Sequence, residues 1–160
     1  MKRCLALTAA AIVAAASSLF LVSPAFAASP TCNTSAGYDT NIPWPNWPGH
    51  YIRAKLPAYQ ASGQPATSTC TLRRGNSGEA VGVLQNTLNE CFNLSEVLEE
   101  DGIFGGRTEA MLKQAQGYAG TAADGVYGPD TRNHFNYDNH WATYDPYGGW
   151  LYCQSVNGLP

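Results

Sequence analysis

Apolar residues between positions 72 and 137 recur every three or four residues, which is the period of an α-helix with one buried face. The first predicted helix follows a cap at Asn76 or Ser77, and its buried positions are Val81, Leu84, Leu88 and Cys91. A second helix is predicted over about residues 107–116. A third begins at Pro129, whose fixed φ suits a first helical position, and carries Phe135 on its inner face. The pattern predicts a mainly α protein with three helices in this stretch.

The two flanks of this helical stretch lack its period. Residues 28–69 contain prolines that interrupt helices and favour extended or turn backbone, namely Pro30, Pro43, Pro45, Pro48, Pro57 and Pro65. The rings of Trp44, Trp47 and Tyr51 indicate that this arm packs on the body, because linkers seldom carry so much apolar area. Residues 138–160 are rich in aromatic residues and turn signals, which predicts irregular or short β structure. We therefore expect a Pro-rich arm at 28–69, a helical domain at 70–137 and an aromatic tail at 138–160, with irregular flanks tied to the helical domain by disulfides.

An eight-residue pattern occurs at the entrances of both the second and the third predicted helix. "DGIFGGRT" begins at Asp101, and "DGVYGPDT" begins at Asp124. The Asp-Gly pair predicts a tight turn, and the threonine hydroxyl can bond free N–H groups in the first helical turn. The motif positions are Asp101, Gly102, Phe104, Gly105, Thr108, Asp124, Gly125, Gly128, Pro129 and Thr131. Folding alone explains this repeat, so the pattern by itself carries no catalytic meaning.

The first 27 residues have the pattern of an export signal. Lys2 and Arg3 precede an apolar run that extends to position 22, and Ala25-Phe26-Ala27 has the small-x-small pattern of a signal peptidase site. A membrane anchor is the alternative, but no basic stop-transfer segment follows the run. We expect cleavage after residue 27 and a secreted protein, extracellular or associated with the cell wall, with no membrane segment left after cleavage.

Charge and cysteine content narrow the function further. Nine basic and twelve acidic residues give a net charge of −3, which makes nucleic acid a poor partner because its binding depends on neutralising phosphates. After the signal, the cysteines are Cys32, Cys70, Cys91 and Cys153, and an even number in an exported chain indicates two disulfides. All three pairings remain open. A zinc site is the alternative, without any C-x2-C or paired histidine spacing to support it.

Three ordered blocks of the chain resemble the family-1 peptidoglycan-binding domain of bacterial cell-wall proteins. They are "LRRGNSGEAVGVLQNTLN", "DGIFGGRTEAMLKQAQ" and "DGVYGPDT", and their matching positions outside the repeat are Leu72, Gly75, Gly78, Val81, Leu84, Gln85, Leu88 and Gln116. The resemblance covers about half of the chain after the signal. It implies a compact three-helix bundle that attaches to peptidoglycan, usually as the targeting module of a hydrolase. The chain departs from the family pattern at Met111, Ala115, Thr121 and His134, and at Ala115 the family usually has Phe.

The sequence offers no convincing catalytic set. His134, Asp138 and His140 are the nearest group of zinc-ligand types, but their spacing fits no metallopeptidase pattern. Two disulfides leave no thiol nucleophile, and the run at residues 99–101 is more simply a solvated acidic surface than a glycosidase pair. We therefore expect no enzyme activity, no metal site and no cofactor.

A binding function remains, and peptidoglycan offers two kinds of contact. Arginine can hold peptide carboxylates through paired hydrogen bonds, and aromatic rings can stack on sugar faces. The candidate contacts are Arg73, Arg107, Arg132, Tyr118, Tyr127, Trp141 and Trp150. For each arginine a solvated surface position is the plainer explanation, and Tyr127 is more simply a core residue. We expect a monomeric protein that binds peptidoglycan without cleaving it. The alternatives are a secreted inhibitor or interaction module on the same scaffold, or a small cell-wall hydrolase.

Overall fold

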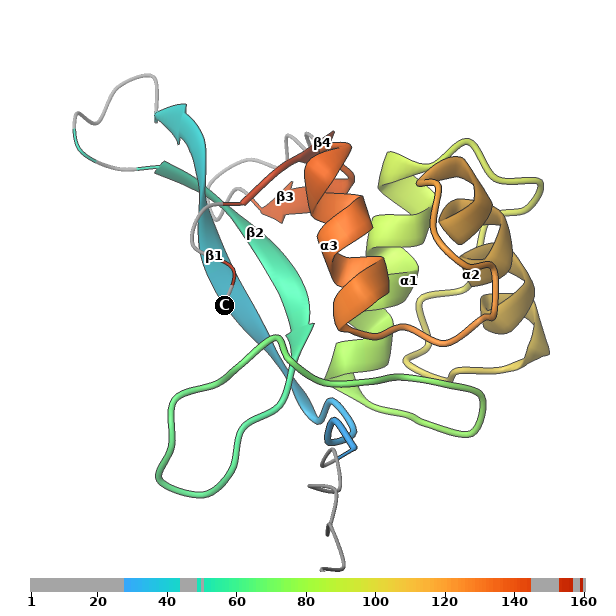
Figure 1. Ribbon diagram of the computed structural model, residues 1–160, viewed down its shortest axis with the longest axis horizontal. Helices are drawn as coiled ribbons and strands as arrows, with labels where there is room; N and C mark the ends of the chain where they lie inside the picture. The colour runs from blue at the N-terminus through green and yellow to red at the C-terminus, as the bar shows by residue number, and fades with distance from the viewer. Residues whose placement is uncertain (1–27, 44–48, 50, 145–152, 157–158, 160) are drawn as a thin grey trace, which may run out of the picture.

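The computed structural model describes residues 28–43, 49, 51–144, 153–156 and 159. Within these residues the elements are β1 (Thr34–Pro43), β2 (Tyr51–Ala58), α1 (Glu79–Cys91), α2 (Gly106–Tyr118), α3 (Pro129–Tyr137), β3 (Trp141–Tyr144) and β4 (Cys153–Gln154). The strands form one antiparallel sheet in the order β1-β2-β3-β4. Helix α1 packs against the sheet, and α2 lies on the side of the helices away from it (Figure 1). The described residues do not include the predicted signal segment at 1–27, nor Trp44, Trp47 and Trp150.

The sheet overturns the expected mainly α bundle with irregular flanks. Strands β1 and β2 pair from Thr34 opposite Ala58 to Pro43 opposite Tyr51, with one irregularity in the register. Proline lacks the N–H that a central strand would donate, so strands tolerate it mainly at their ends and edges. Pro43 is the last residue of β1, and Pro57 lies one residue before the end of β2. The prolines of the arm are therefore compatible with a hairpin, in a segment that was expected to be irregular.

Strand β2 carries the alternating pattern of a half-buried strand. Ile52, Ala54 and Leu56 are buried, whereas Arg53 and Lys55 between them are exposed. Successive side chains of a strand point to opposite faces, so this alternation places one face of β2 on the core.

The tail completes the sheet. In the register of β2 with β3, Arg53 lies opposite Tyr144, and β3 in turn pairs with β4. An isolated antiparallel bridge between Thr40 and Val156 brings the chain after β4 back to β1. The short β structure expected in the tail is present at β3 and β4.

Two disulfides connect the strand-forming flanks to the helical segment. Cys32 pairs with Cys70, and Cys91 at the end of α1 pairs with Cys153 of β4. The expectation of two disulfides is confirmed, and the structure selects one of the three possible pairings.

The three predicted helices are present, although the first is capped differently from the prediction. Gly78 is the N-cap of α1 and no side chain caps this helix, so the predicted cap at Asn76 or Ser77 is wrong. The side chain of Asn76 instead accepts a hydrogen bond of 2.8 Å from the N–H of Arg73. Helix α3 begins at Pro129, as predicted.

One hydrophobic core joins the sheet to the helices. Its largest fully buried side chains include Trp141 of β3, Tyr127, Phe104 and Phe135. The ring of Trp141 meets Tyr127 edge-on at 6.2 Å between centroids and lies 5.8 Å from Phe135. The tail therefore supplies a central core residue. Across the described residues, no helix combines the length and the apolar character needed to cross a membrane.

Candidate functional site

Each Asp-Gly turn is held by a buried glutamine from the preceding helix. In the first copy the amide of Gln85 donates to the carboxylate of Asp101 (2.9 Å) and to the carbonyl of Ile103 (3.1 Å). Its carbonyl oxygen accepts the N–H of Gly102 at 2.9 Å. The hydroxyl of Thr108 donates to the carbonyl of Ile103 and accepts from Gln85, both at 3.3 Å. This polar network fixes the turn at the start of α2.

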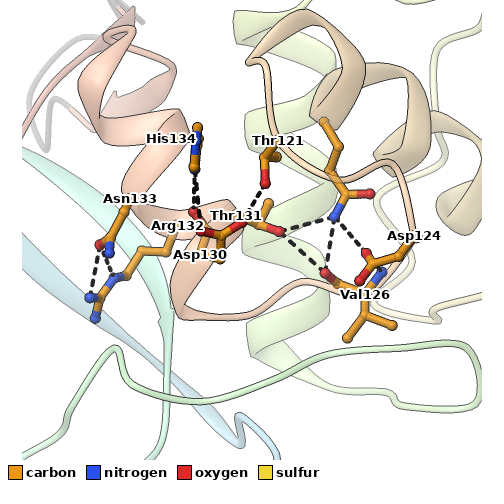
Figure 2. A network of polar contacts seen from close by, with 9 residues as sticks. Thr121, Asp124, Val126, Asp130, Thr131, Arg132, Asn133 and His134 are labelled. Carbon is orange, nitrogen blue, oxygen red and sulfur yellow. Dashed lines mark hydrogen bonds and ion pairs between the residues drawn. The ribbon is translucent and has the colours of Figure 1, made fainter.

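The second copy repeats the network contact by contact. Gln116 donates to Asp124 (2.9 Å), Val126 (3.1 Å) and Thr131 (3.0 Å) and accepts the N–H of Gly125 at 2.8 Å. Figure 2 shows Asp124, Val126 and Thr131 converging at the start of α3. Neither α2 nor α3 has a side-chain cap, so the predicted bond from the threonines to first-turn N–H groups is wrong. The threonines bond a turn carbonyl and a glutamine amide instead.

Both turns require glycine at their second position. Gly102 and Gly125 have φ angles of 69° and 74°, a conformation that side chains with a Cβ rarely adopt. A Cβ at Gly125 would also lie 2.7 Å from Cε of Lys113 and 2.8 Å from Cγ of Glu109. The Asp-Gly pair is therefore set by backbone geometry, as the sequence predicted.

The network keeps the first turn negatively charged. The Gln85 amide, followed by the N–H of Ile103, lowers the pKa of Asp101 below its ordinary value, because both donors stabilise the carboxylate. Asp101 is exposed, so this charge faces solvent at the start of α2.

The two copies differ in the length of the connection before the turn. The glutamine and aspartate are separated by 16 positions in the first copy and by 8 in the second. The longer connection lies along α2: the N–H of Ser95 donates to the amide oxygen of Gln114 at 3.2 Å, and Gln114 donates to the Ser95 hydroxyl at 2.8 Å. The extra residues therefore form a wall beside α2 that the second copy lacks.

A groove of about 240 Å³ opens between this wall and the first turn of α2. We call it the α2 entrance groove, and its lining residues are Gln85, Leu98, Glu99, Asp101, Ile103, Gly105, Gly106, Arg107 and Thr108. The first-turn N–H groups of a helix and its positive dipole end favour anions. The guanidinium of Arg107 adds a full positive charge, whereas Glu99 and Asp101 are acidic. The groove can therefore attract a ligand that carries both an anionic group and a hydrogen-bond donor or cation.

Among the predicted arginines, only Arg107 lines this groove. Its side chain is 70% exposed and pairs with Glu96, with an Nη2–Oε2 distance of 2.9 Å. Arg73 is exposed and does not line the groove. Arg132 is 3% exposed, and its guanidinium donates to the hydroxyls of Ser68 (2.9 Å) and Thr69 (3.4 Å). Its position thus ties α3 to the segment that precedes Cys70.

The predicted aromatic contacts separate into buried and exposed groups. Tyr127 and Trp141 are fully buried, so their rings face the core and not solvent. Tyr118 is 65% exposed at the end of α2, away from the groove. Trp150 lies outside the described residues and stays a prediction.

The sequence interpretation missed several groove residues. Gln85 was matched to the family pattern without a role, and Glu99 was read as part of a solvated run. The signal that could have identified Gln85 is its counterpart Gln116, since both glutamines lie one helix before an Asp-Gly turn.

His134, Asp138 and His140 are the nearest group of zinc-ligand types in the sequence, and they do not come together in the structure. Within the described ranges, no three His, Cys, Asp or Glu side chains are placed to hold a metal ion together. Nδ1 of His134 lies 2.9 Å from the backbone oxygen of Asp130. His140 stacks on Phe92 with ring centroids 4.3 Å apart.

Known proteins are similar to parts of this chain. A zinc D-Ala-D-Ala carboxypeptidase from Streptomyces albus G is 43% identical over 63 residues, which is 39% of this chain and 25% of the relative. This chain therefore spans about a quarter of the length of that relative. The solved SleB N-terminal domain is 34% identical, with 42% of this chain and 90% of that domain covered and a TM-score of 0.38. A peptidoglycan-binding protein from Clostridioides difficile, solved in complex with glutamine hydroxamate, is 24% identical, with 58% and 65% covered and a TM-score of 0.37.

The family match contains both turns and the groove. Residues 77–134 match the family described as "Putative peptidoglycan binding domain". Every residue that lines the α2 entrance groove falls within this range. Residues 77–134 of this chain are therefore similar to that peptidoglycan-binding family.

Proposed function

We propose that this protein is exported, attaches to bacterial cell-wall peptidoglycan through the α2 entrance groove, and does not cleave it. The observation that carries the proposal is the family match at residues 77–134, which contains the whole lining of the groove. The two disulfides support an extracellular location, since such bonds persist in oxidising compartments.

The charges of the groove suit the peptide part of peptidoglycan. Stem peptides carry carboxylates, and the guanidinium of Arg107 beside the first-turn N–H groups of α2 attracts such a group. Glu96 accepts hydrogen bonds from Nε and Nη2 of Arg107 at 3.1 and 2.9 Å. A guanidinium has five N–H donors, so a ligand carboxylate can be added to the same side chain. Glu99 and Asp101, which also line the groove, can accept hydrogen bonds from peptide N–H or ammonium groups.

The second copy of the turn is unsuited to the same ligand. The position equivalent to Arg107 is Asp130, and Pro129 replaces Gly106, which removes one first-turn N–H. Figure 2 shows the Asp130 side chain beside Thr121 and His134; it accepts the Thr121 hydroxyl and lies 3.6 Å from Nδ1 of His134. The proposal therefore assigns peptide binding to the first copy alone.

The absence of cleavage rests on the available chemistry. All four cysteines that follow the predicted signal are in disulfides, which removes a thiol nucleophile. The histidines of the described segments do not come together with acids in a metal-holding group. Similarity to the carboxypeptidase covers 25% of that relative, so its activity is not transferred to this chain.

Cosedimentation with purified peptidoglycan tests the groove directly. Arg107→Ala should weaken binding about two- to fivefold at low salt, because exposed ion pairs contribute up to about 1 kcal/mol and are screened by ions. Arg53→Ala is the matched control. This side chain is also exposed and paired with an acid, Asp39, but it lies on β2, and no residue of β2 lines the groove. Equal loss of binding in both variants, or no loss in either, would count against the groove as the binding site. Steady release of sugars or peptides from the wall would contradict the non-catalytic assignment.

A further inference from the structure

A second pocket lies beside the last residues of α1 and α2 and the segment that follows α3. Its volume is about 280 Å³, and we call it the helix-end pocket. Its lining residues are Cys91, Phe92, Asn93, Tyr118 and His140. Cys91 and Tyr118 end α1 and α2, and His140 follows α3 by three residues. The family match ends at residue 134, so the pocket combines the family domain with the tail of this chain.

Aromatic rings form much of the lining of this pocket. Phe92 is 8% exposed and stacks on His140, with centroids 4.3 Å apart and an angle of 11° between the rings. The ring of Phe92 also packs against that of Phe135, with centroids 4.7 Å apart. The ring of Tyr118 is 65% exposed. The pocket thus combines a rigid aromatic stack with one accessible ring.

The lining is polar but uncharged. Asn93 is exposed and offers an amide donor and an amide acceptor. None of the five lining residues is Asp, Glu, Lys or Arg. Burial lowers the pKa of His140, partly offset by Asp138, so the imidazole is neutral at physiological pH. The α2 entrance groove, with Glu99, Asp101 and Arg107, has the opposite character.

From this contrast we infer that the helix-end pocket binds one neutral sugar ring of the glycan strand. The inference rests on the proposed attachment to peptidoglycan and adds a second subsite to it. A sugar ring presents an apolar C–H face, which an accessible aromatic ring can cover, and an edge of hydroxyl and acetamido groups, which an amide can bond. The volume lies just below the range of roughly 300–1,000 Å³ for drug-sized ligands, which suits a single sugar ring.

The two subsites lie at opposite ends of one helix. Arg107 and Tyr118 are separated by about three turns of α2, or ~16 Å along its axis. The wall residues from Asn93 to Glu99 run beside α2 from the pocket to the groove, as the contacts of Ser95 with Gln114 and of Glu96 with Arg107 show. An extended peptide of about five residues spans ~17 Å. A sugar at Tyr118 and the carboxylate of its attached peptide at Arg107 therefore fit one continuous ligand.

Two soluble probes distinguish binding of the sugar from binding of the peptide. The protein without its predicted signal segment is labelled with ¹⁵N. It is titrated with the β-1,4-linked tetramer of N-acetylglucosamine and, separately, with a synthetic sugar-free stem peptide. The tetramer should shift the amide signals of Asn93 and His140 most strongly. Tyr118→Ala should weaken tetramer binding about tenfold and leave peptide binding unchanged, because it removes a stacking contact. Tyr118→Phe should stay within about twofold of the natural protein, since the ring is retained.

Tyr137→Ala is the matched control. Tyr137 is the last residue of α3, as Tyr118 is of α2, and is 88% exposed, but it does not line the pocket. Any of three results would overturn the sugar subsite: no binding of the tetramer, equally strong binding by Tyr118→Ala, or signal shifts centred on the α2 entrance groove. If whole peptidoglycan still cosediments in that case, the proposed function survives and only the sugar subsite is lost. Tetramer binding at the pocket without cosedimentation would support the sugar subsite and reject the proposed function.

Discussion

The side-chain amide of Gln85 donates a hydrogen bond of 2.9 Å to the carboxylate of Asp101, 16 positions away. The same relationship, at the same distance, joins Gln116 to Asp124. Both glutamines are 1% exposed and use the donor and the acceptor end of their amides. Each helix–turn–helix unit therefore closes around a buried glutamine whose partners lie in the following Asp-Gly turn and at the start of the next helix.

Removal of either glutamine should destabilise the fold. Gln85→Ala leaves the N–H of Gly102 without its acceptor in a buried position, which costs about 1–3 kcal/mol. Gln116→Ala should cost a similar amount, because its contacts are equivalent. Urea unfolding at neutral pH measures both losses. Gln114→Ala, which removes a partly exposed amide of the same helix as Gln116, should cost less than about 1 kcal/mol. A loss at Gln85 no larger than at Gln114 would refute the assignment.

The first turn should weaken in acid. The pKa of Asp101 is lowered in the folded protein, first by the Gln85 amide and then by the N–H of Ile103. The stability that Asp101 contributes is therefore fully present above its unfolded-state pKa and is lost as the pH falls through the lower, folded pKa. An NMR titration of the carboxyl carbon should give a value below 3.8 in the natural protein. In Gln85→Ala, if it remains folded, the value should move back toward 3.8. No difference between the two proteins would show that Gln85 does not set this charge.

Substitution of Arg132 should act on the fold. Arg132→Ala removes the donor to the buried hydroxyl of Ser68 and should cost about 1–3 kcal/mol in the free energy of unfolding. Arg73→Ala, at an exposed position, should change stability by less than about 0.5 kcal/mol. Thermal melting followed by circular dichroism compares the two. A melting temperature of Arg132→Ala equal to that of the natural protein would leave Arg132 open as a ligand contact.

Restoration of the family's usual residue at position 115 should overpack the core. Ala115 is fully buried in the cluster that also contains Trp141 from the tail. Ala115→Phe inserts a ring into this packed interior and should destabilise the protein by about 1–3 kcal/mol. A higher melting temperature would instead reveal unfilled space beside Ala115.

The helices and turns were predictable because their signals are local. Pro129 at a helix start and glycine after Asp101 and Asp124 act through the backbone of their own residues. The sheet depends on pairing between distant segments, such as Thr34 with Ala58, and prolines near the strand ends concealed the alternation in β2.

The site was partly predictable for the same reason. Arg107 was named as a candidate because it is an arginine near a predicted helix entrance, and the structure places it in the lining of the α2 entrance groove. Residue type alone could not separate buried Tyr127 and Trp141 from exposed Tyr118, because burial of the first two depends on the sheet that covers the helices. The partners of Gln85 became visible only when α1 and the turn after it were placed together.

Cosedimentation of the mature protein with purified bacterial peptidoglycan tests the central claim most directly. The protein should bind saturably, lose part of its affinity as salt is raised, and leave the supernatant free of released sugars and peptides. Recovery of all of the protein in the supernatant, with walls from several bacteria at low salt, would contradict the account.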